Sequence, residues 1–119
     1  MLLDSNIIIY AARSEYPELR EFIAKHAPAV SVISYVEVLG YRGLSPDEQK
    51  HFEDFFSAAR MCDVSDAVIQ QATKLRRIKR ITLGDSLIAA TAIVHGLTLI
   101  TRNTGDFDWV DNLPLLNPM

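Results

Sequence analysis

Four acidic residues stand where apolar stretches give way to polar turns or helix starts, and they are Asp4, Glu37, Asp85 and Asp106. They lie in the segments MLLDSNIIIY, VISYVEVLGY, ITLGDSLIAA and TRNTGDFDW. A small domain rarely places carboxylates beside its core unless they are paired, hydrogen-bonded or bound to a metal. Four such residues from distant parts of the chain suggest one convergent acidic site. Hard divalent cations prefer oxygen ligands, so we expect the site to bind Mg²⁺ or Mn²⁺.

Carboxylate-bound metal would suit chemistry on a phosphodiester. Such a cation can activate and orient water, and it neutralises charge on the phosphate. Two cations could clamp both the attacking and the leaving oxygen. Four carboxylates brought together without a metal repel one another, which raises some of their pKa values. A bound cation would therefore help to explain the cluster.

Each acid also has a purely structural explanation. Asp4 could cap a helix, and Glu37 could be the capping-box partner of Ser34. Asp85 would be favourable near a helix N-terminus, and Asp106 could be a turn residue. Taken singly, each of these explanations is at least as good as a functional one. Their coincidence at one edge of a sheet would be harder to explain in this way.

Short β-like runs alternate with helical patterns along the chain. Strands are predicted at residues 2–3, 29–33, 61–64, 97–101 and 113–116. Helices are predicted at residues 7–12, 17–26, from 34 onward, 46–60, 66–79 and 82–96. Ser34 and Glu37 form a capping-box pattern, and Ser45 precedes a proline at the first helical position. The helix that ends at Gly96 is almost entirely apolar and should lie in the middle of the domain.

This alternation predicts an α/β fold with a parallel sheet covered on both faces. In such folds ligands bind beyond the carboxyl ends of the strands, near a switch in strand order. Asp4 and Asp106 each follow a predicted strand, Glu37 comes soon after another, and Asp85 begins the buried helix. All four acids are therefore expected at the same edge.

Bulk composition narrows the class of protein. The 119 residues fit a single domain spanning residues 1–119, and 49% hydrophobic with 23% charged residues is ordinary for a globular protein. No apolar run reaches the roughly 18 residues that would cross a bilayer. The single cysteine, Cys62, cannot form an internal disulfide. We therefore expect a cytoplasmic protein without a membrane segment.

Basic residues gather in one place although the net charge is −3. The run KLRRIKR contains Lys74, Arg76, Arg77, Lys79 and Arg80, and Arg102 lies farther on. These cations could simply complement a helix C-terminus, or they could bind phosphate. The two interpretations are compatible.

Three segments taken together resemble the PIN-domain ribonucleases, specifically the VapC-type toxins of toxin–antitoxin pairs. The segments are LLDSNIIIY, VISYVEVLGY and LGDSLIAATAIVHGLTLITRNTGDF, and the ending LPLLNP is similar to the last strand of the family. The resemblance covers essentially the whole chain. It implies a three-layer α/β/α fold with a five-stranded parallel sheet. It also implies Mg²⁺- or Mn²⁺-dependent endonucleolytic cleavage of RNA that leaves a 5′-phosphate and a 3′-hydroxyl.

The resemblance also assigns roles to residues. It implies that Asp4 and Asp85 are the most direct metal ligands, whereas Glu37 and Asp106 bind a second metal or order the attacking water. Asn6, Thr101 and Asn103 match positions near these acids: Asn6 and Thr101 support them, and Asn103 stands where many relatives have an aspartate. Ser5 replaces the usual threonine. Either Asp106 therefore serves alone as the fourth acidic group, or the fourth ligand of the site is weak.

Partners follow from the same resemblance, which implies a homodimer and a cognate antitoxin that binds beside the active site. We expect the antitoxin to dock in a groove between the early helices that includes residues 16–22. Two alternatives are a non-catalytic PIN-fold module and a haloacid-dehalogenase-type phosphatase. The phosphatase would need an aspartate two residues after Asp4, where this chain has Asn6.

Overall fold

Five parallel strands form one sheet in the order β3-β2-β1-β4-β5. The computed structural model describes all residues from Met1 to Met119. The strands are β1 (Leu2–Leu3), β2 (Ala29–Ser31), β3 (Met61–Cys62), β4 (Leu99–Ile100) and β5 (Leu115–Leu116). The sheet confirms the predicted fold class, although most strands are shorter than their apolar runs.

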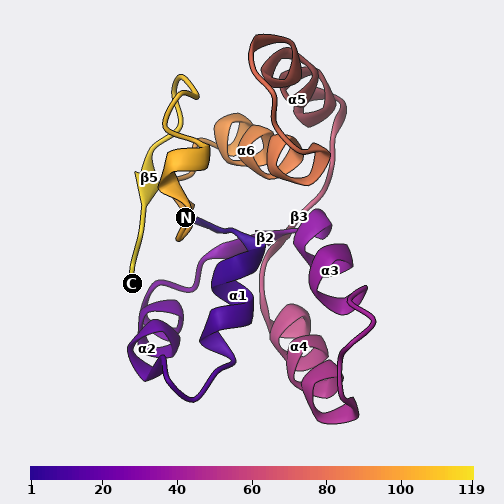
Figure 1. Ribbon diagram of the computed structural model, residues 1–119, viewed down its shortest axis with the longest axis vertical. Helices are drawn as coiled ribbons and strands as arrows, with labels where there is room; N and C mark the ends of the chain where they lie inside the picture. Colours follow the sequence, from indigo (N-terminus) through magenta and orange to yellow (C-terminus); the bar gives the residue numbers. More distant parts are fainter.

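Helices cover both faces of this sheet (Figure 1). They are α1 (Ser5–Ala11), α2 (Pro17–His26), α3 (Val32–Leu39), α4 (Pro46–Ala58), α5 (Asp66–Ile78) and α6 (Leu83–His95), with a short 3₁₀ helix, η1 (Thr104–Asp106). Helices α5 and α6 lie on one side of the sheet, and α1, α2 and α4 lie on the other (Figure 1). None of the helices is long and apolar enough to cross a membrane.

Alternating strand residues divide the core into two layers. Leu2 and Leu99 belong to a buried cluster with Ile88 of α6. Their neighbours Leu3 and Ile100 belong to a second buried cluster with residues of α1 and α4. Because successive side chains of a strand point to opposite faces, the three central strands β2, β1 and β4 each contribute to both layers.

Most helix boundaries follow the local signals in the sequence. Ser45 and Glu48 form a complete capping box at the start of α4, and Thr82 caps α6 through its side chain. Gly96 ends α6 in the left-handed conformation with φ 63°. Helix α6 buries residues all around its axis, as its apolar composition predicts.

The predicted capping box at Ser34 and Glu37 is wrong. Strand β2 ends at Ser31, whose side chain caps α3 by accepting a hydrogen bond from the N–H of Ile33. Ser34 is therefore already inside the helix and is fully buried. The apolar run from residue 29 to 33 hid this boundary, because a buried strand and a buried helix turn have the same composition.

Strand β1 marks the switch in strand order. It pairs with β2 on one side and with β4 on the other, and the chain reaches β4 only after β3, α5 and α6. The carboxyl ends of β1 and β4 therefore flank the position where α/β folds bind ligands. Asp4 follows β1 and Thr101 follows β4.

Candidate active site

Asp4 is the most deeply placed carboxylate of the site, with an exposed fraction of 6%. Its Oδ2 accepts a hydrogen bond of 2.8 Å from the hydroxyl of Thr101, which bridges the ends of β1 and β4. Its Oδ1 accepts a bond of 2.8 Å from the N–H of Ser5 at the start of α1. Asp4 is thus the N-cap residue of α1, but the bond to Thr101 shows a tertiary role that capping does not explain.

Glu37 reaches the same edge through a serine pair. The Oγ of Ser5 lies 2.8 Å from Glu37 Oε1 and 2.9 Å from Ser34 Oγ. Because a hydroxyl carries one proton and a carboxylate can only accept, Ser5 donates to Glu37 and Ser34 supplies the proton of the other bond. Ser34 and Glu37 are therefore partners in a tertiary network that orients the Glu37 carboxylate.

Asp85 lies in the first turn of α6, beside a glycine that makes room for Glu37. A Cβ atom added to Gly84 would lie 2.8 Å from Glu37 Oε2, so only glycine leaves this carboxylate where it is. The N–H of Asp85 donates to the hydroxyl of Thr82 at 3.2 Å. This cap fixes the start of α6 and with it the position of Asp85.

Asp106 is held by its backbone in η1. Its N–H donates to the carbonyl of Asn103, and its carbonyl accepts from Nε1 of Trp109 at 2.9 Å. The N–H of Asn103 donates to the hydroxyl of Thr101, which itself donates to Asp4. Asn103 therefore supports the site through its backbone, while its side chain is exposed.

Asn6 has a different environment from the other predicted polar residues. Its side-chain oxygen is buried and has no hydrogen-bond partner. The structure shows no hydrogen bond between its side chain and any of the four acids. A buried unpaired acceptor costs free energy, and this one lies two residues after Asp4.

Electrostatics show that the four acids act on one another. Burial is the main cause that raises the pKa of Asp4 from its usual 3.8 to about 6, against the lowering effect of the Thr101 hydrogen bond, and the charges of Asp85 and Glu37 raise it further. Burial also raises the pKa of Asp85, as do the charges of Glu37 and Asp106, while the Thr82 hydrogen bond lowers it. The fold thus gathers four carboxylates into one region of negative potential.

A divalent cation fits this donor set. No group of three or more histidine, cysteine, aspartate or glutamate side chains is arranged closely enough to encase a metal by itself. Mg²⁺ does not require such a cage, because it keeps several waters and is commonly bound by one or two carboxylates plus phosphate oxygens. Burial, together with repulsion between the neighbouring carboxylates, raises the pKa of Asp4 and of Asp85, and a bound cation would oppose both effects by stabilising the charged forms.

An open cleft of about 460 Å³ borders the site. Its lining residues are Arg76, Arg80, Ile81, Thr82, Asp85 and Asp106. The sequence pattern singled out the basic run, but it did not predict which of its members would approach the acids. It also gave no role to Gly84. A glycine directly before a candidate metal ligand is a signal that could have indicated close approach.

Comparison with known proteins gives the family. The model of the PIN domain family matches residues 1–113, so the chain belongs to the PIN-domain family. Ribonuclease VapC10 of Mycobacterium tuberculosis is 31% identical over 121 residues, an alignment that covers 95% of this chain and 90% of that protein. Ribonuclease VapC1 of Rickettsia felis is 52% identical over 40 residues, which are 32% of this chain and 30% of the relative.

Solved structures agree with this membership. A toxin–antitoxin complex from Klebsiella pneumoniae contains a chain that is 28% identical, with a TM-score of 0.79 and coverage of 99% of this chain and 97% of the other. VapBC2 from Rickettsia felis, bound to a DNA fragment from its promoter, gives 26% identity and a TM-score of 0.85 over 98% and 96% of the two chains. The predicted resemblance to VapC-type PIN-domain proteins is confirmed.

Proposed function

We propose that this PIN-domain protein is a metal-dependent endoribonuclease and the toxin of a toxin–antitoxin pair. The observation that carries the proposal is Asp4, a buried carboxylate bonded to Thr101 across the switch in strand order. The charges of Asp85 and Glu37 act on Asp4, and that of Asp106 acts on Asp85, at the position where α/β folds bind ligands. Relatives named Ribonuclease VapC support RNA as the substrate.

Asp4 and Asp85 would be the most direct ligands of Mg²⁺ or Mn²⁺. Glu37 and Asp106 would hold a second cation or order the attacking water. The metal, when bound, would supply Lewis-acid activation of water and neutralisation of charge on the phosphate. In the hydrolysis, the water oxygen forms a bond to phosphorus and the bond from phosphorus to the 3′-oxygen breaks. The products are a 5′-phosphate and a 3′-hydroxyl.

The chain's own residues keep the carboxylates in place before substrate arrives. Thr101 and the N–H of Ser5 each occupy one oxygen of Asp4, which prevents rotation of the carboxylate. The Ser5 hydroxyl does the same for one oxygen of Glu37. Rigid first ligands reduce the reorganisation needed when metal and RNA bind. We assign Thr101, Ser5 and Ser34 as positioning residues on this basis.

Partners and location complete the proposal. The complexes from Klebsiella pneumoniae and Rickettsia felis support a cognate antitoxin, and we propose that the chain forms a homodimer in the cytoplasm as a single PIN domain over residues 1–119. An apolar pocket of about 220 Å³ between α1, α2 and α4 supports antitoxin docking near the predicted 16–22 region. Its lining includes Arg20 and Ile23 of α2.

Cleavage of total cellular RNA by purified, antitoxin-free protein tests the function. Reactions with Mg²⁺, with Mn²⁺ and with chelator are compared for the wild type and Asp4→Asn. Asp54→Asn, which changes an exposed acid on α4, is the matched control. Discrete fragments that require both metal and Asp4 are expected. A folded protein that neither binds Mn²⁺ in calorimetry nor cleaves RNA would instead be a non-catalytic PIN-fold module.

A further inference from the structure

We infer that Arg76 and Arg80 form a phosphate subsite that holds the RNA strand beside the carboxylates. The inference rests on the proposed function, since it names the contact through which that same site would hold its substrate. The two arginines line one cleft together with Asp85 and Asp106. Its volume of about 460 Å³ is within the range of small-ligand pockets, roughly 300–1,000 Å³, and suits about one nucleotide.

Both arginine side chains are free to bind a ligand. The only ion pair in the structure joins Lys50 to Asp54 on α4, so neither arginine is within 4.0 Å of a carboxylate. Both residues are exposed, and neither side chain makes a hydrogen bond to another protein group. The cleft therefore presents guanidinium donors and carboxylates that do not neutralise one another.

Separated charges of both signs in one cleft suit a ligand that itself carries both signs. A phosphodiester with its divalent cation is such a ligand, because the cation faces the carboxylates while phosphate oxygens face the arginines. Guanidinium groups bind phosphate with two parallel N–H···O bonds, which fixes the orientation of the group as well as its position. Arg76 and Arg80 would thus hold a phosphate of the strand while Asp85 approaches the metal.

Helix electrostatics alone do not account for this placement. Arg76 and Arg77 lie in the last turn of α5 and complement its dipole there. Arg80 lies beyond the helix, whose C-cap is Lys79, and it still lines the cleft with Arg76. Lys79 is engaged elsewhere, with its ammonium 5.7 Å from the ring centre of Trp109. The run KLRRIKR is therefore divided, and only two of its five cations border the acids.

The salt dependence of RNA binding tests the inference. The probe is a fluorescein-labelled single-stranded RNA of random sequence, bound by the full chain with Ca²⁺ replacing Mg²⁺, and a gel verifies that the RNA stays intact. The double variant Arg76→Ala/Arg80→Ala should weaken binding at least tenfold at low salt. It should also reduce the slope of log affinity against log salt by about 1.4, since each lost contact to single-stranded RNA accounts for about 0.7.

The control Lys74→Ala/Arg77→Ala removes two charges from the same segment but none from the cleft. We expect it to change the slope by less than about 0.7, one phosphate contact. Equal slopes for the two double variants, or an unchanged slope for Arg76→Ala/Arg80→Ala, would overturn the inference.

Metal-dependent cleavage of total RNA by the wild type is measured in parallel, so that the subsite and the proposed function can fail separately. If cleavage occurs while the slopes of the two double variants are equal, the subsite is refuted and the proposed function stands. If the slopes differ but the folded protein neither binds Mn²⁺ nor cleaves RNA, the subsite stands as an RNA-binding contact and the proposed nuclease activity is refuted.

Discussion

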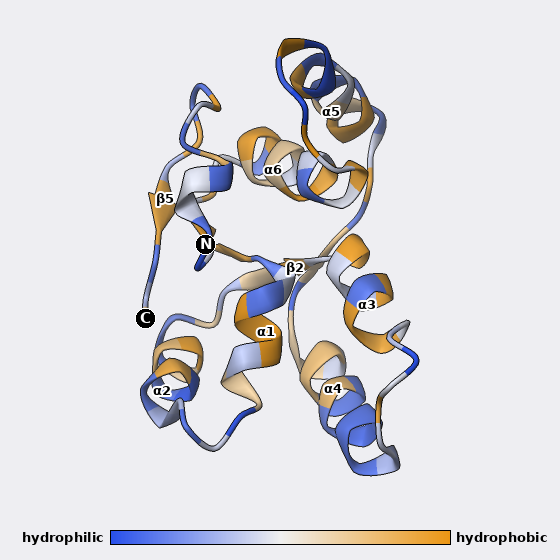
Figure 2. Ribbon diagram, viewed as in Figure 1, coloured by the Kyte–Doolittle hydropathy of each residue, from blue (hydrophilic) through white to orange (hydrophobic).

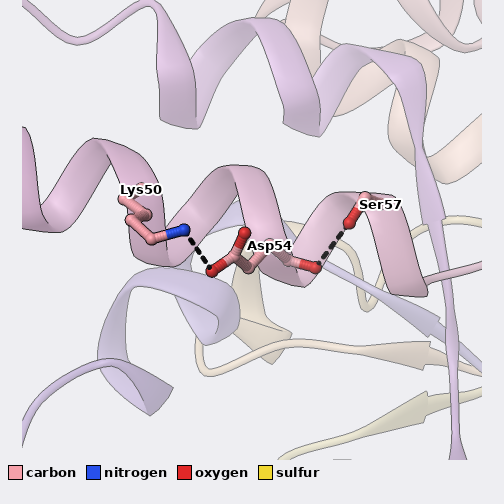
Figure 3. A network of polar contacts seen from close by, with 3 residues as sticks. All are labelled: Lys50, Asp54 and Ser57. Atoms are coloured by element: carbon pink, nitrogen blue, oxygen red, sulfur yellow. Dashed lines mark hydrogen bonds and ion pairs between the residues drawn. The ribbon is translucent and has the colours of Figure 1, made fainter.

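Acidic side chains have opposite environments in two regions of this molecule, the exposed surface of α4 and the carboxyl edge of the sheet. On α4, Asp54 accepts a hydrogen bond of 3.4 Å from the ammonium of Lys50, one turn away, and both side chains are largely exposed at 68% and 79% (Figure 3). Hydrophilic residues dominate the N-terminal turns of this helix (Figure 2). At the sheet edge, Asp4 is 6% exposed, and no cation of the chain lies within ion-pair distance of it.

These two environments differ in whether a cation from outside the chain would stabilise the carboxylates. On α4 the charge of Asp54 is exposed to water and lies beside a lysine, and an exposed pair of this kind contributes little to stability. At the sheet edge, burial and repulsion oppose ionisation of Asp4 and Asp85, and the chain supplies only hydrogen bonds in compensation. An acidic cluster whose ionisation is opposed by burial and repulsion is typical of a functional site.

The largest effect is expected from Asp4→Asn. The change removes a ligand charge while keeping size, so the rate of RNA cleavage should fall by about 1,000-fold, which corresponds to several kcal/mol of lost metal-assisted stabilisation. Asp54→Asn on α4 should leave the rate within about twofold, because a distant exposed charge contributes little to the site. Cleavage of total RNA by equal amounts of folded protein measures both. Equal activity of the two variants would contradict the role of the sheet edge.

In the metal-free protein, the buried carboxylates of the sheet edge should make the free energy of unfolding depend on pH. Because the pKa of Asp4 is raised from 3.8 to about 6, the folded state keeps a proton that the unfolded state has already released. Stability should therefore fall as pH rises from about 4 to about 6, by about 3 kcal/mol, and then level off. Asp85 contributes in the same direction.

Urea unfolding in chelator at pH 4, 5, 6 and 7 measures this dependence. Asp4→Asn should lose most of it and should be more stable than the wild type at pH 7. Added Mg²⁺ should stabilise the wild type more than the variant, because a ligand that binds only the folded state shifts the equilibrium. A wild type that gains stability between pH 4 and pH 6 would refute the electrostatic explanation.

Gly84→Ala is expected to separate stability from activity at the sheet edge. The added methyl group would push Glu37 from its position, since its Cβ would lie 2.8 Å from Glu37 Oε2. The flexible glutamate can move, so folding should improve by up to about 1 kcal/mol because alanine is the better helix former. Cleavage should nevertheless fall about tenfold.

Gly105→Ala is the matched control for this variant. A Cβ at Gly105 meets nothing within 4 Å, although the residue lies directly before Asp106. It should therefore retain near wild-type activity. Similar losses in the two variants would mean that the approach of Glu37 to Gly84 is not what matters.

The smallest effect is expected on α4. Lys50→Ala removes an exposed pair between residues four apart and should cost about 0.3 kcal/mol in the free energy of unfolding, with no change in cleavage. Urea unfolding at low and at high salt measures this cost, which should shrink as salt screens the charges. A loss above about 2 kcal/mol would show that the exposed pair contributes far more to stability than a solvated pair of residues four apart should.

The succession of strands and helices along the chain could be predicted from the sequence alone. So could the caps at Ser45 and Thr82 and the end of α6 at Gly96. These features depend on neighbours a few residues apart, whose hydrogen bonds and periodicity can be read locally. The sequence also indicated the four acids, because carboxylates beside apolar runs are uncommon. Local signals failed at Ser34, where the serine and Glu37 matched a capping box that the fold does not use.

The contacts between residues that are distant in the sequence depend on the tertiary structure. It joined Asp4 to Thr101, which is 97 residues away, and Ser5 to Glu37, which is 32 residues away. It brought Arg76 and Arg80, but not Arg77, into the cleft of Asp85 and Asp106. Strand pairing and the packing of α6 against α5 set these approaches, and such long-range geometry is not encoded in the spacing of any single segment.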